Sequence, residues 1–266
     1  MKKNEKKLGL MITTMNYEID HVLKKFNKYT KNCKISISHQ ITDKKIKPKK
    51  IINKNLKYSF MYNKGLSKNR NNALNNLDSD IILICDDDVT FCKNFKDTIL
   101  SAYKKYPKSD IITFQIQKPS GELMRNYKPN TFKHNKFSIL MVSSICITFR
   151  KKSFIENKLK FDKNFGLGAK YCVGEENIFL KDAIDKKLNL RYIPKPIVIH
   201  KAESSGSNWR DELIISRVVV FKRMYGVLGG LASVFYFSII KYKSYKHKYS
   251  FFKFLKLSFK GLFSKI

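Results

Sequence analysis

The chain has 266 residues, enough for one large α/β domain or two small ones, and its hydrophobic content of 43% is ordinary for a globular protein. Its five cysteines form an odd set without a CxxC pair or a Cys/His spacing suited to zinc, so the sequence indicates neither a disulfide framework nor a structural zinc site. The formal net charge of +33 is spread along the chain as lysine without a nucleic-acid-binding signature; we expect no nucleic-acid partner, although a basic nucleic-acid-binding protein stays an alternative.

The first 62 residues alternate strand and helix patterns in the way that is typical of an α/β fold. Residues 8–13 predict a buried first strand, because their apolar stretch is too short for the core of a signal peptide. A helix within 17–29 and a second strand at 33–38 complete a βαβ opening, and a third short strand is expected at 56–62. With free cysteines and no signal sequence, a cytoplasmic protein is the simplest expectation.

A helix is expected after Gly65. Ser67 suits its N-cap, and Ala73, Leu74 and Leu77 give it one apolar face.

The most buried strand is expected at residues 81–85, an uninterrupted apolar run that ends at Asp86, Asp87 and Asp88. Like charges crowded at the end of a buried strand need a cation or hydrogen-bond donors to offset them. Carboxylates suit Mg²⁺ or Mn²⁺, which bridge to nucleotide phosphates, and the carboxyl edge of a parallel sheet is where α/β folds bind ligands. The triplet indicates a metal-assisted nucleotide site, with a solvated acidic turn as the alternative.

The second half continues the α/β pattern. We expect a helix at 95–106, a strand at 110–116, a strand pair within 137–149, a loop at 165–168, a helix from 174 to about 187, and strands at 190–193 and 197–200.

The last 56 residues form a predicted helical region of their own, so the domains are expected at 1–210 and 211–266. Residues 227–240 are almost wholly apolar, but fourteen residues fall short of the roughly 20 that a spanning helix needs. Residues 241–266 interleave lysines with aromatic and aliphatic residues and contain no acidic residue. This pattern favours a basic amphipathic helical tail on an anionic membrane surface; a helix that caps the core is the alternative.

One arrangement of these motifs resembles the nucleotide-sugar-binding half of family 2 glycosyltransferases of the bacterial surface-polysaccharide type. Gly65 and Arg70 open the helix ahead of the strand that carries the aspartates. The resemblance implies a GT-A-like fold, with a mixed, mostly parallel central sheet flanked by helices. It implies that Gly65, Arg70, Asp86 and Asp87 contact the nucleotide sugar, and that Asp88, with Asp86, binds Mn²⁺ or Mg²⁺.

A second motif agrees in position with the same family. The loop at 165–168 followed by Gly174, Glu175, Glu176 and Asn177 is similar to the element that supplies the catalytic base of inverting enzymes. By position Glu176 takes the base role, although the family usually has Asp there, and Glu175 is the alternative. Acidic residues that only interact with the helix dipole would give the same pattern.

The resemblance also implies nucleoside contacts. Thr13, Thr14, Met15 and Asn16 match the loop after the first strand. Gln40 and Asp43 fall near the second nucleoside-contacting loop, which departs from the usual sequence.

Two residues near the end of this region leave alternatives open. His200 ends the last strand, where some members have a third metal ligand, and a structural role is the alternative. Trp209 suits either a segment that closes over the donor or a packing role.

Together these features predict an inverting, metal-dependent glycosyltransferase. It would move a sugar, by resemblance from a UDP-sugar, to a glycan or lipid-linked glycan acceptor at the inner face of the cell membrane. A metal-dependent nucleotidyltransferase is a further alternative, but the chain lacks the phosphate-cradling motifs GxxxxGK[ST] and GxGxxG.

Overall fold

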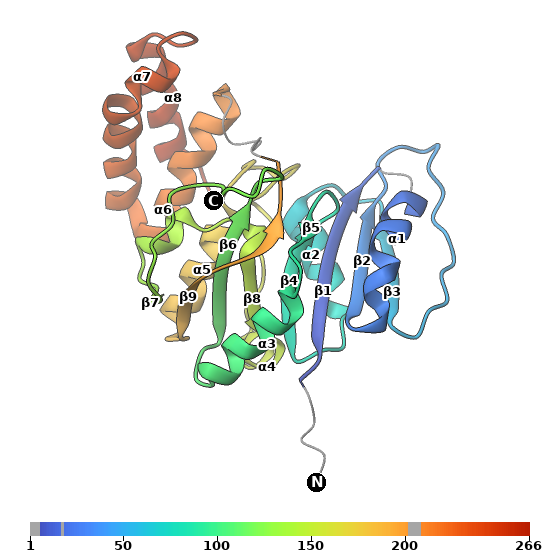
Figure 1. Cartoon of the computed structure of the whole chain (residues 1–266). Coiled ribbons are helices and arrows are strands. Elements are labelled where there is room, and N and C mark those ends of the chain that lie inside the picture. The colour runs from blue at the N-terminus through green and yellow to red at the C-terminus, as the bar shows by residue number, and fades with distance from the viewer. Residues whose placement is uncertain (1–5, 17–18, 202–208) are drawn as a thin grey trace. The chain divides into compact units, whose positions relative to one another are not determined.

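A mixed β-sheet forms the centre of the structure, a computed structural model that describes residues 6–16, 19–201 and 209–266 (Figure 1). Among these residues the sheet has nine strands in the order β3-β2-β1-β4-β8-β6-β9-β5, with β7 paired to β9. The strands are β1 (Leu8–Met15), β2 (Lys34–Gln40), β3 (Leu56–Met61), β4 (Ile81–Asp86), β5 (Thr90–Phe91), β6 (Ile111–Gln117), β7 (Phe132–Lys133), β8 (Ile147–Arg150) and β9 (Leu190–Ile199). The pairings make β1, β2, β3, β4, β6 and β9 run in one direction, so the sheet is mostly parallel, as predicted.

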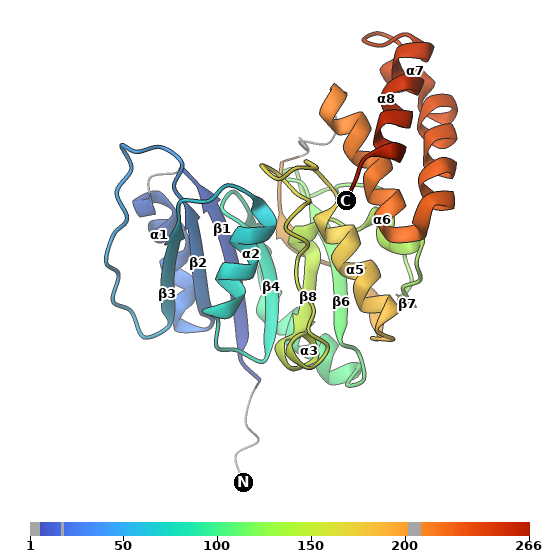
Figure 2. The same cartoon turned by 180° about the vertical axis from the view of Figure 1, so that it is seen from behind.

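Helices cover both faces of this sheet. Helices α1 (Ile19–Asn27) and α3 (Phe95–Lys105) lie on the face towards the viewer in Figure 1, and α2 (Leu66–Asn75) lies in front in the opposite view of Figure 2. The apolar side of α1 and of α3 packs in one core cluster with alternate residues of the strands, among them Ile112 and Phe114. The predicted βαβ opening and the predicted α/β class are both confirmed.

The central strands are buried because their sequences are apolar throughout. Residues 81–85 of β4 have no exposed surface, as expected of a strand covered on both faces. Its neighbour β1 is parallel and in a register that pairs Leu8 with Ile81 and Thr13 with Asp86. This register brings the last residues of two strands to the same edge.

The predicted strand pair within 137–149 is wrong. The segment contains two 3₁₀ turns, η2 (Ser138–Met141) and η3 (Ser144–Cys146), before the short strand β8. The Asn135 side-chain oxygen accepts hydrogen bonds from the backbone N–H groups of Phe137 and Ser138, each at 2.9 Å. A side chain that satisfies these donors locally competes with strand pairing.

The two strands predicted at 190–193 and 197–200 are a single strand, β9. Its prolines lie where the pairing with β6 becomes irregular, since the register shifts on both sides of the Gln115–Pro196 pair. A proline, which has no N–H to donate, is tolerated at such an irregularity.

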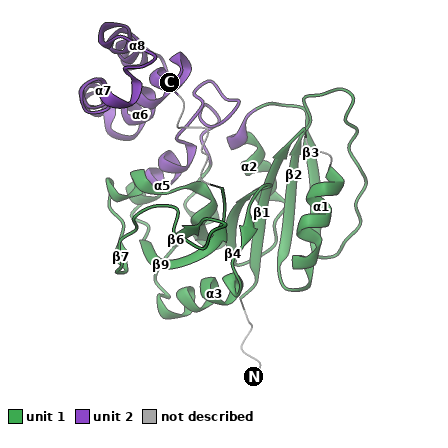
Figure 3. Ribbon diagram, turned by 45° about the horizontal axis from the view of Figure 1, so that its top comes forward, with its two compact units in different colours: residues 1–64, 68–160, 183–202 green, residues 65–67, 161–182, 203–266 purple. Residues whose placement is uncertain are grey.

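The described chain divides into two compact units, coloured separately in Figure 3. Unit 1 comprises residues 1–64, 68–160 and 183–202 and contains the whole sheet; unit 2 comprises residues 65–67, 161–182 and 203–266. The predicted domain boundary after residue 210 stays a prediction, although residues 161–182 group with the C-terminal helices.

Unit 2 is built mainly from helices. They are most of α5 (Glu175–Asp185), α6 (Asp211–Phe235), the π-helix η4 (Tyr236–Ile240), α7 (Tyr242–Tyr245) and α8 (Phe251–Phe263). Helix α8 starts at the N-cap Ser250 and packs closely on α6, since a Cβ atom on Gly261 would lie 2.7 Å from the Ile215 carbonyl oxygen. The Trp209 ring is buried against Phe254, so Trp209 has the packing role that was one of its two predicted alternatives. The other alternative was a segment that closes over the donor, of which residues 202–208 lie outside the described residues.

Helix α6 and η4 together form the only described helical stretch that is long and apolar enough to cross a membrane by length and composition. It runs over Asp211–Ile240, is 30 residues long and has a most apolar window of mean hydropathy 1.5, of which 39% is buried. Gly226 has non-helical backbone angles (φ 74°, ψ −173°) and divides this stretch into two helices at a kink, and the Phe221 and Phe237 ring centroids on its two sides lie only 5.6 Å apart. The apolar residues 227–240 follow this kink. A buried core helix passes the same test.

Candidate functional site: a carboxylate cluster and a glutamate-bearing helix

Three acidic side chains lie where β4 ends, and each has a different partner. The Thr14 hydroxyl, at the end of β1, donates a hydrogen bond to the Asp87 carboxylate. The Lys25 ammonium group, from α1, donates to the backbone oxygen of Asp87 at 2.7 Å. Strand β1 and helix α1 thus each supply one side chain that holds Asp87 in place.

Burial and the neighbouring carboxylates act on the pKa of the Asp87 carboxyl in the opposite direction to its hydrogen bond. Burial raises the pKa of its carboxyl, and the charges of Asp88 and Asp86 raise it further, while the Thr14 hydrogen bond and the Lys25 charge act in the opposite direction. Burial also lowers the pKa of Lys25, and the attraction of Asp88 and Asp87 partly offsets this. A cluster with excess negative charge of this kind favours the approach of a cation.

Asp86 is held by a buried arginine. The Arg70 guanidinium, on α2, lies 3.3 Å from an Asp86 carboxylate oxygen, and the Arg70 side chain is only 1% exposed. The neighbouring Asn69 side chain donates to the Thr14 backbone oxygen at 3.1 Å. The start of α2 therefore positions the ends of both β1 and β4, which gives Arg70 a structural task beside its predicted contact to the nucleotide sugar.

Asp88 and His200 come together from positions 112 residues apart. The His200 ring Nε2 lies 3.0 Å from an Asp88 carboxylate oxygen, and Asp88 is 63% exposed while His200 is 22% exposed. The His200 N–H donates to the Gln117 carbonyl at 2.9 Å, which fixes the end of β9 beside the end of β6. In the part of the chain that the structure describes, no three His, Cys, Asp or Glu side chains gather as a metal-holding group.

The predicted nucleoside-side residues lie at the ends of β1 and β2. Met15 is 47% exposed and pairs in register with Gln40, whose buried side chain donates to the Asn63 carbonyl at 2.5 Å. Asp43 is exposed, and its carboxylate accepts from the Lys45 N–H at 2.9 Å. Met15 and Asp43 thus have surface available to a ligand, whereas the Gln40 amide is bound to the protein.

Asn16, the last residue of the predicted nucleoside loop after the first strand, joins these two loops. Its side-chain oxygen accepts from the N–H groups of Thr42 and Asp43 at 2.7 and 3.2 Å, and its own N–H donates to the Gln40 carbonyl at 2.9 Å. Asn16 has a positive φ of 52°, a conformation that asparagine adopts more readily than most residues.

In unit 2, the glycine-containing loop at 165–168 binds the start of α2. The Leu66 N–H donates to the Leu167 carbonyl at 2.8 Å, next to Gly65 with its φ of 130°. Ser67 lies inside α2 and is not its N-cap; its hydroxyl instead donates to the Phe165 carbonyl at 2.7 Å.

The two adjacent glutamates of unit 2 have different surroundings. Glu175 is 5% exposed and lies against Gly166, where a Cβ atom would be 3.1 Å from a Glu175 carboxylate oxygen. Glu176 is partly exposed and, like Glu175, lies in the first turn of α5. Gly174, with a φ of 85°, allows the chain to enter this helix.

The structure combines a mixed, mostly parallel α/β sheet with a carboxylate cluster at its strand ends, and the sequence comparison identifies the family. The profile described as glycosyl transferase family 2 matches residues 38–184. The chain belongs to this family and is an enzyme of the transferase class. No curated protein matches the chain.

Solved structures of S. aureus TarS have a similar fold. The chain aligns with TarS at a TM-score of 0.61 and 16% identity, which covers 92% of this chain but 46% of TarS. It aligns with TarS 1–349 in complex with UDP-GlcNAc at a TM-score of 0.63 and 16% identity, covering 92% and 76% of the two chains. The chain thus spans less than half the length of the longer of these two TarS chains. At this identity the likeness establishes the GT-A-like fold.

Proposed function

We propose that the chain is an inverting glycosyltransferase that moves a sugar from a UDP-sugar to a glycan or lipid-linked glycan acceptor. The observation that carries the proposal is the cluster at the strand ends, in which Thr14, Arg70 and His200 each hold one aspartate. Family membership supports the reaction class, and the UDP-GlcNAc complex of TarS supports the choice of donor.

Glu176 is the proposed general base. It takes the proton from an acceptor hydroxyl while that oxygen forms a bond to the anomeric carbon and the bond to the nucleoside diphosphate breaks. Attack from the face opposite the leaving group inverts the anomeric configuration. The burial of Glu175 against Gly166 supports Glu176 as the base. A general base must contact an acceptor that enters from solvent, and Glu176 has the more accessible side chain.

The donor atoms at the cluster fit a divalent cation. Asp88 offers an exposed carboxylate and His200 an imidazole nitrogen 3.0 Å away, and Mn²⁺ accepts both kinds of ligand. Asp86 is less suited as a ligand, because one of its oxygens is paired with Arg70. When bound, Mn²⁺ or Mg²⁺ would neutralise charge on the departing diphosphate. Lys25 and Arg70 add positive charge of the protein beside the aspartates.

We expect the Asp88→Asn substitution to weaken Mn²⁺-dependent UDP binding at least as much as the roughly 10- to 100-fold typical of altered groups around a metal. The measurement is calorimetric titration of the protein with UDP, once in the presence of Mn²⁺ and once in the presence of EDTA. Donor turnover is then measured over a panel of UDP-, GDP- and dTDP-sugars. Asp97→Asn is the matched control, since Asp97 is an exposed residue of α3 and the substitution removes the same charge away from the cluster. UDP binding that EDTA and Asp88→Asn leave unchanged would contradict the metal site.

The C-terminal tail supports a position at the inner face of the cell membrane. One side of α8 packs on α6 through Phe254 and Leu262, so the tail caps its own unit, while Phe252 and Phe263 stay 79% and 78% exposed. Residues 241–266 contain eight lysines and no acidic residue. Exposed aromatic rings among lysines match the interface of an anionic bilayer, where each nearby lysine contributes about 1 kcal/mol.

We expect the full chain to sediment with vesicles that contain phosphatidylglycerol and to dissociate at high salt. The double substitution Phe252→Ser/Phe263→Ser should lower the partition coefficient at least about tenfold, because burying one aromatic side chain is worth about 1.5–3 kcal/mol. Ile155→Ser, which removes a residue 59% exposed in unit 1, should have no effect. Equal sedimentation of all three proteins would contradict a membrane contact through the tail.

A further inference from the structure

A cavity of about 440 Å³ lies in unit 1 beside β6 and β9, beneath the segment that connects β6 to η2. Thr113 and Tyr192 line it from the sheet, and Phe132 lines it from β7. Its volume lies within the range of about 300–1,000 Å³ that is usual for small-molecule sites.

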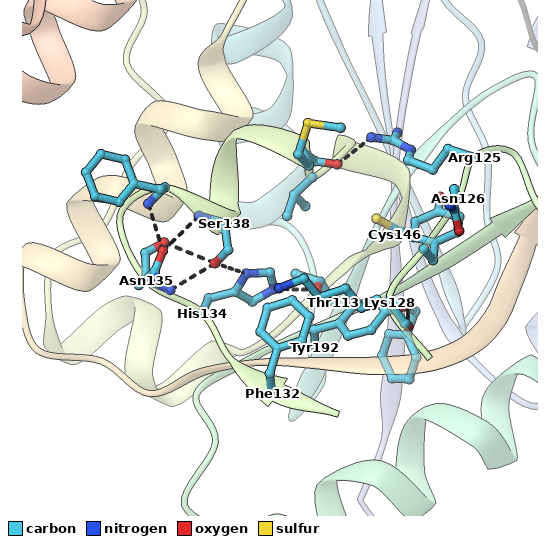
Figure 4. A pocket seen from close by; sticks show the side chains of 15 residues that line it. Thr113, Arg125, Asn126, Lys128, Phe132, His134, Asn135, Ser138, Cys146 and Tyr192 are labelled. Atoms are coloured by element: carbon cyan, nitrogen blue, oxygen red, sulfur yellow. Dashed lines mark hydrogen bonds between the residues drawn. The ribbon is translucent and has the colours of Figure 1, made fainter. Parts of the chain in front are cut away.

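Aromatic side chains form one wall of this cavity. The Phe132 and Tyr192 ring centroids lie 4.8 Å apart, and Tyr127 is stacked on Tyr192 at 6.4 Å (Figure 4). Phe137 and Met141 also line the cavity and remain 63% and 66% exposed. Large apolar side chains left open to water around a cavity favour an apolar ligand.

The uncharged polar groups of His134, Thr113, Ser138 and Tyr192 in the cavity already have partners in the protein. The His134 ring bonds the Thr113 hydroxyl at 2.7 Å and the Ser138 hydroxyl at 2.9 Å, as the dashed lines of Figure 4 show. Burial lowers the pKa of His134 to about 4, so the ring is neutral at neutral pH. The Tyr192 hydroxyl accepts from Gln115 and donates to the Lys128 carbonyl. A ligand rich in hydroxyl groups would find few partners here, and an apolar group displaces water at little cost.

Two cationic side chains give the cavity a positive charge. The Lys128 ammonium lies 5.3 Å from the centre of the Phe132 ring, and the Arg125 guanidinium is fixed by the Met141 carbonyl at 2.5 Å and the Ser143 hydroxyl at 2.6 Å. Of the described residues that line the cavity, none is acidic. The preferred ligand therefore carries an anionic group attached to its apolar part.

We propose that this cavity binds a phosphate monoester of an apolar chain, with the phosphate at Lys128 and Arg125; geranyl phosphate serves as its probe. The role of the cavity as the site for the lipid carrier of the acceptor rests on the function proposed above. The binding itself does not, because it needs neither donor nor turnover.

The test is calorimetric titration of the full chain with geranyl phosphate, geraniol, inorganic phosphate and UDP, without metal. We expect geranyl phosphate to bind at least about tenfold more tightly than geraniol or inorganic phosphate, since each of them lacks one half of the recognised group. Lys128→Glu and Phe137→Ser should each weaken geranyl phosphate binding about tenfold or more. Both residues are exposed, so their substitution leaves the fold intact, and Lys104→Glu on the exposed side of α3 is the charge control.

Equal affinity for inorganic phosphate and geranyl phosphate would overturn the proposal, because the apolar wall would then contribute nothing. So would unchanged affinity in Lys128→Glu and Phe137→Ser, or displacement of geranyl phosphate by UDP, which would make the cavity a donor site. Loss of sugar transfer in Glu176→Gln with intact geranyl phosphate binding separates this proposal from the proposed function.

Discussion

Glu176→Gln is expected to lower the turnover number for sugar transfer by about 100- to 10,000-fold, the usual contribution of a general base. Glutamine has nearly the shape of glutamate but does not accept the acceptor's proton at neutral pH. The affinity for the donor should stay unchanged, because the substitution alters no residue of the carboxylate cluster at the strand ends. The measurement is nucleoside diphosphate release with acceptor present, together with UDP titration of the same protein.

Two further variants make the assignment of the base specific. Glu156→Gln replaces an exposed glutamate at the end of α4 (Lys151–Glu156), and we expect it to have no effect. Glu175→Gln alters the buried neighbour and should shift the melting temperature more than Glu176→Gln does. If Glu175→Gln abolished transfer at full stability while Glu176→Gln retained it, Glu175 would be the base.

Gly174→Ala is expected to destabilise the protein by about 2–5 kcal/mol. A Cβ atom at Gly174 would lie 2.6 Å from Val220, and overpacking of this kind costs about 1–3 kcal/mol. The positive φ of 85° adds the roughly 1–2 kcal/mol that an L-residue pays in a left-handed conformation. Such a loss is a large part of a typical stability of about 5–15 kcal/mol, and urea unfolding followed by circular dichroism measures it.

Gly226→Ala separates the two contributions. Gly226 also has a positive φ, of 74°, but an added Cβ would meet nothing within 4 Å. It should therefore cost only the conformational part, about 1–3 kcal/mol, because its φ of 74° and ψ of −173° lie in a region that is almost restricted to glycine. Equal losses of stability in the two variants would show that Val220 moves away from the added Cβ atom without an energetic cost.

Because Gly174 precedes Glu175 and Glu176, we also expect Gly174→Ala to lower transfer activity in the protein that remains folded.

The sequence predicted those parts of the fold that depend on local pattern. An apolar run such as residues 81–85 has few alternatives to a central strand, and the helix at 95–105 follows from its apolar spacing. The segment 137–149 could not be predicted in this way, because its apolar residues suit a strand while the Asn135 side chain holds 3₁₀ geometry. The continuity of β9 could not be predicted from local pattern either, since the irregular register that accommodates Pro196 is a property of the pair of strands.

By itself, the sequence determined the class of the fold, the order of its central elements, the acidic triplet at a strand end and the family, because these depend on residue type and on short spacings along the chain. Tertiary structure alone decided that Asp86 meets Arg70, that Asp88 meets His200, and that Glu175 is buried while Glu176 is accessible. These partners are set by sheet register and by helix packing, which join residues up to 112 positions apart. No local periodicity encodes such contacts, since they depend on how buried surfaces fit together once the strands are paired.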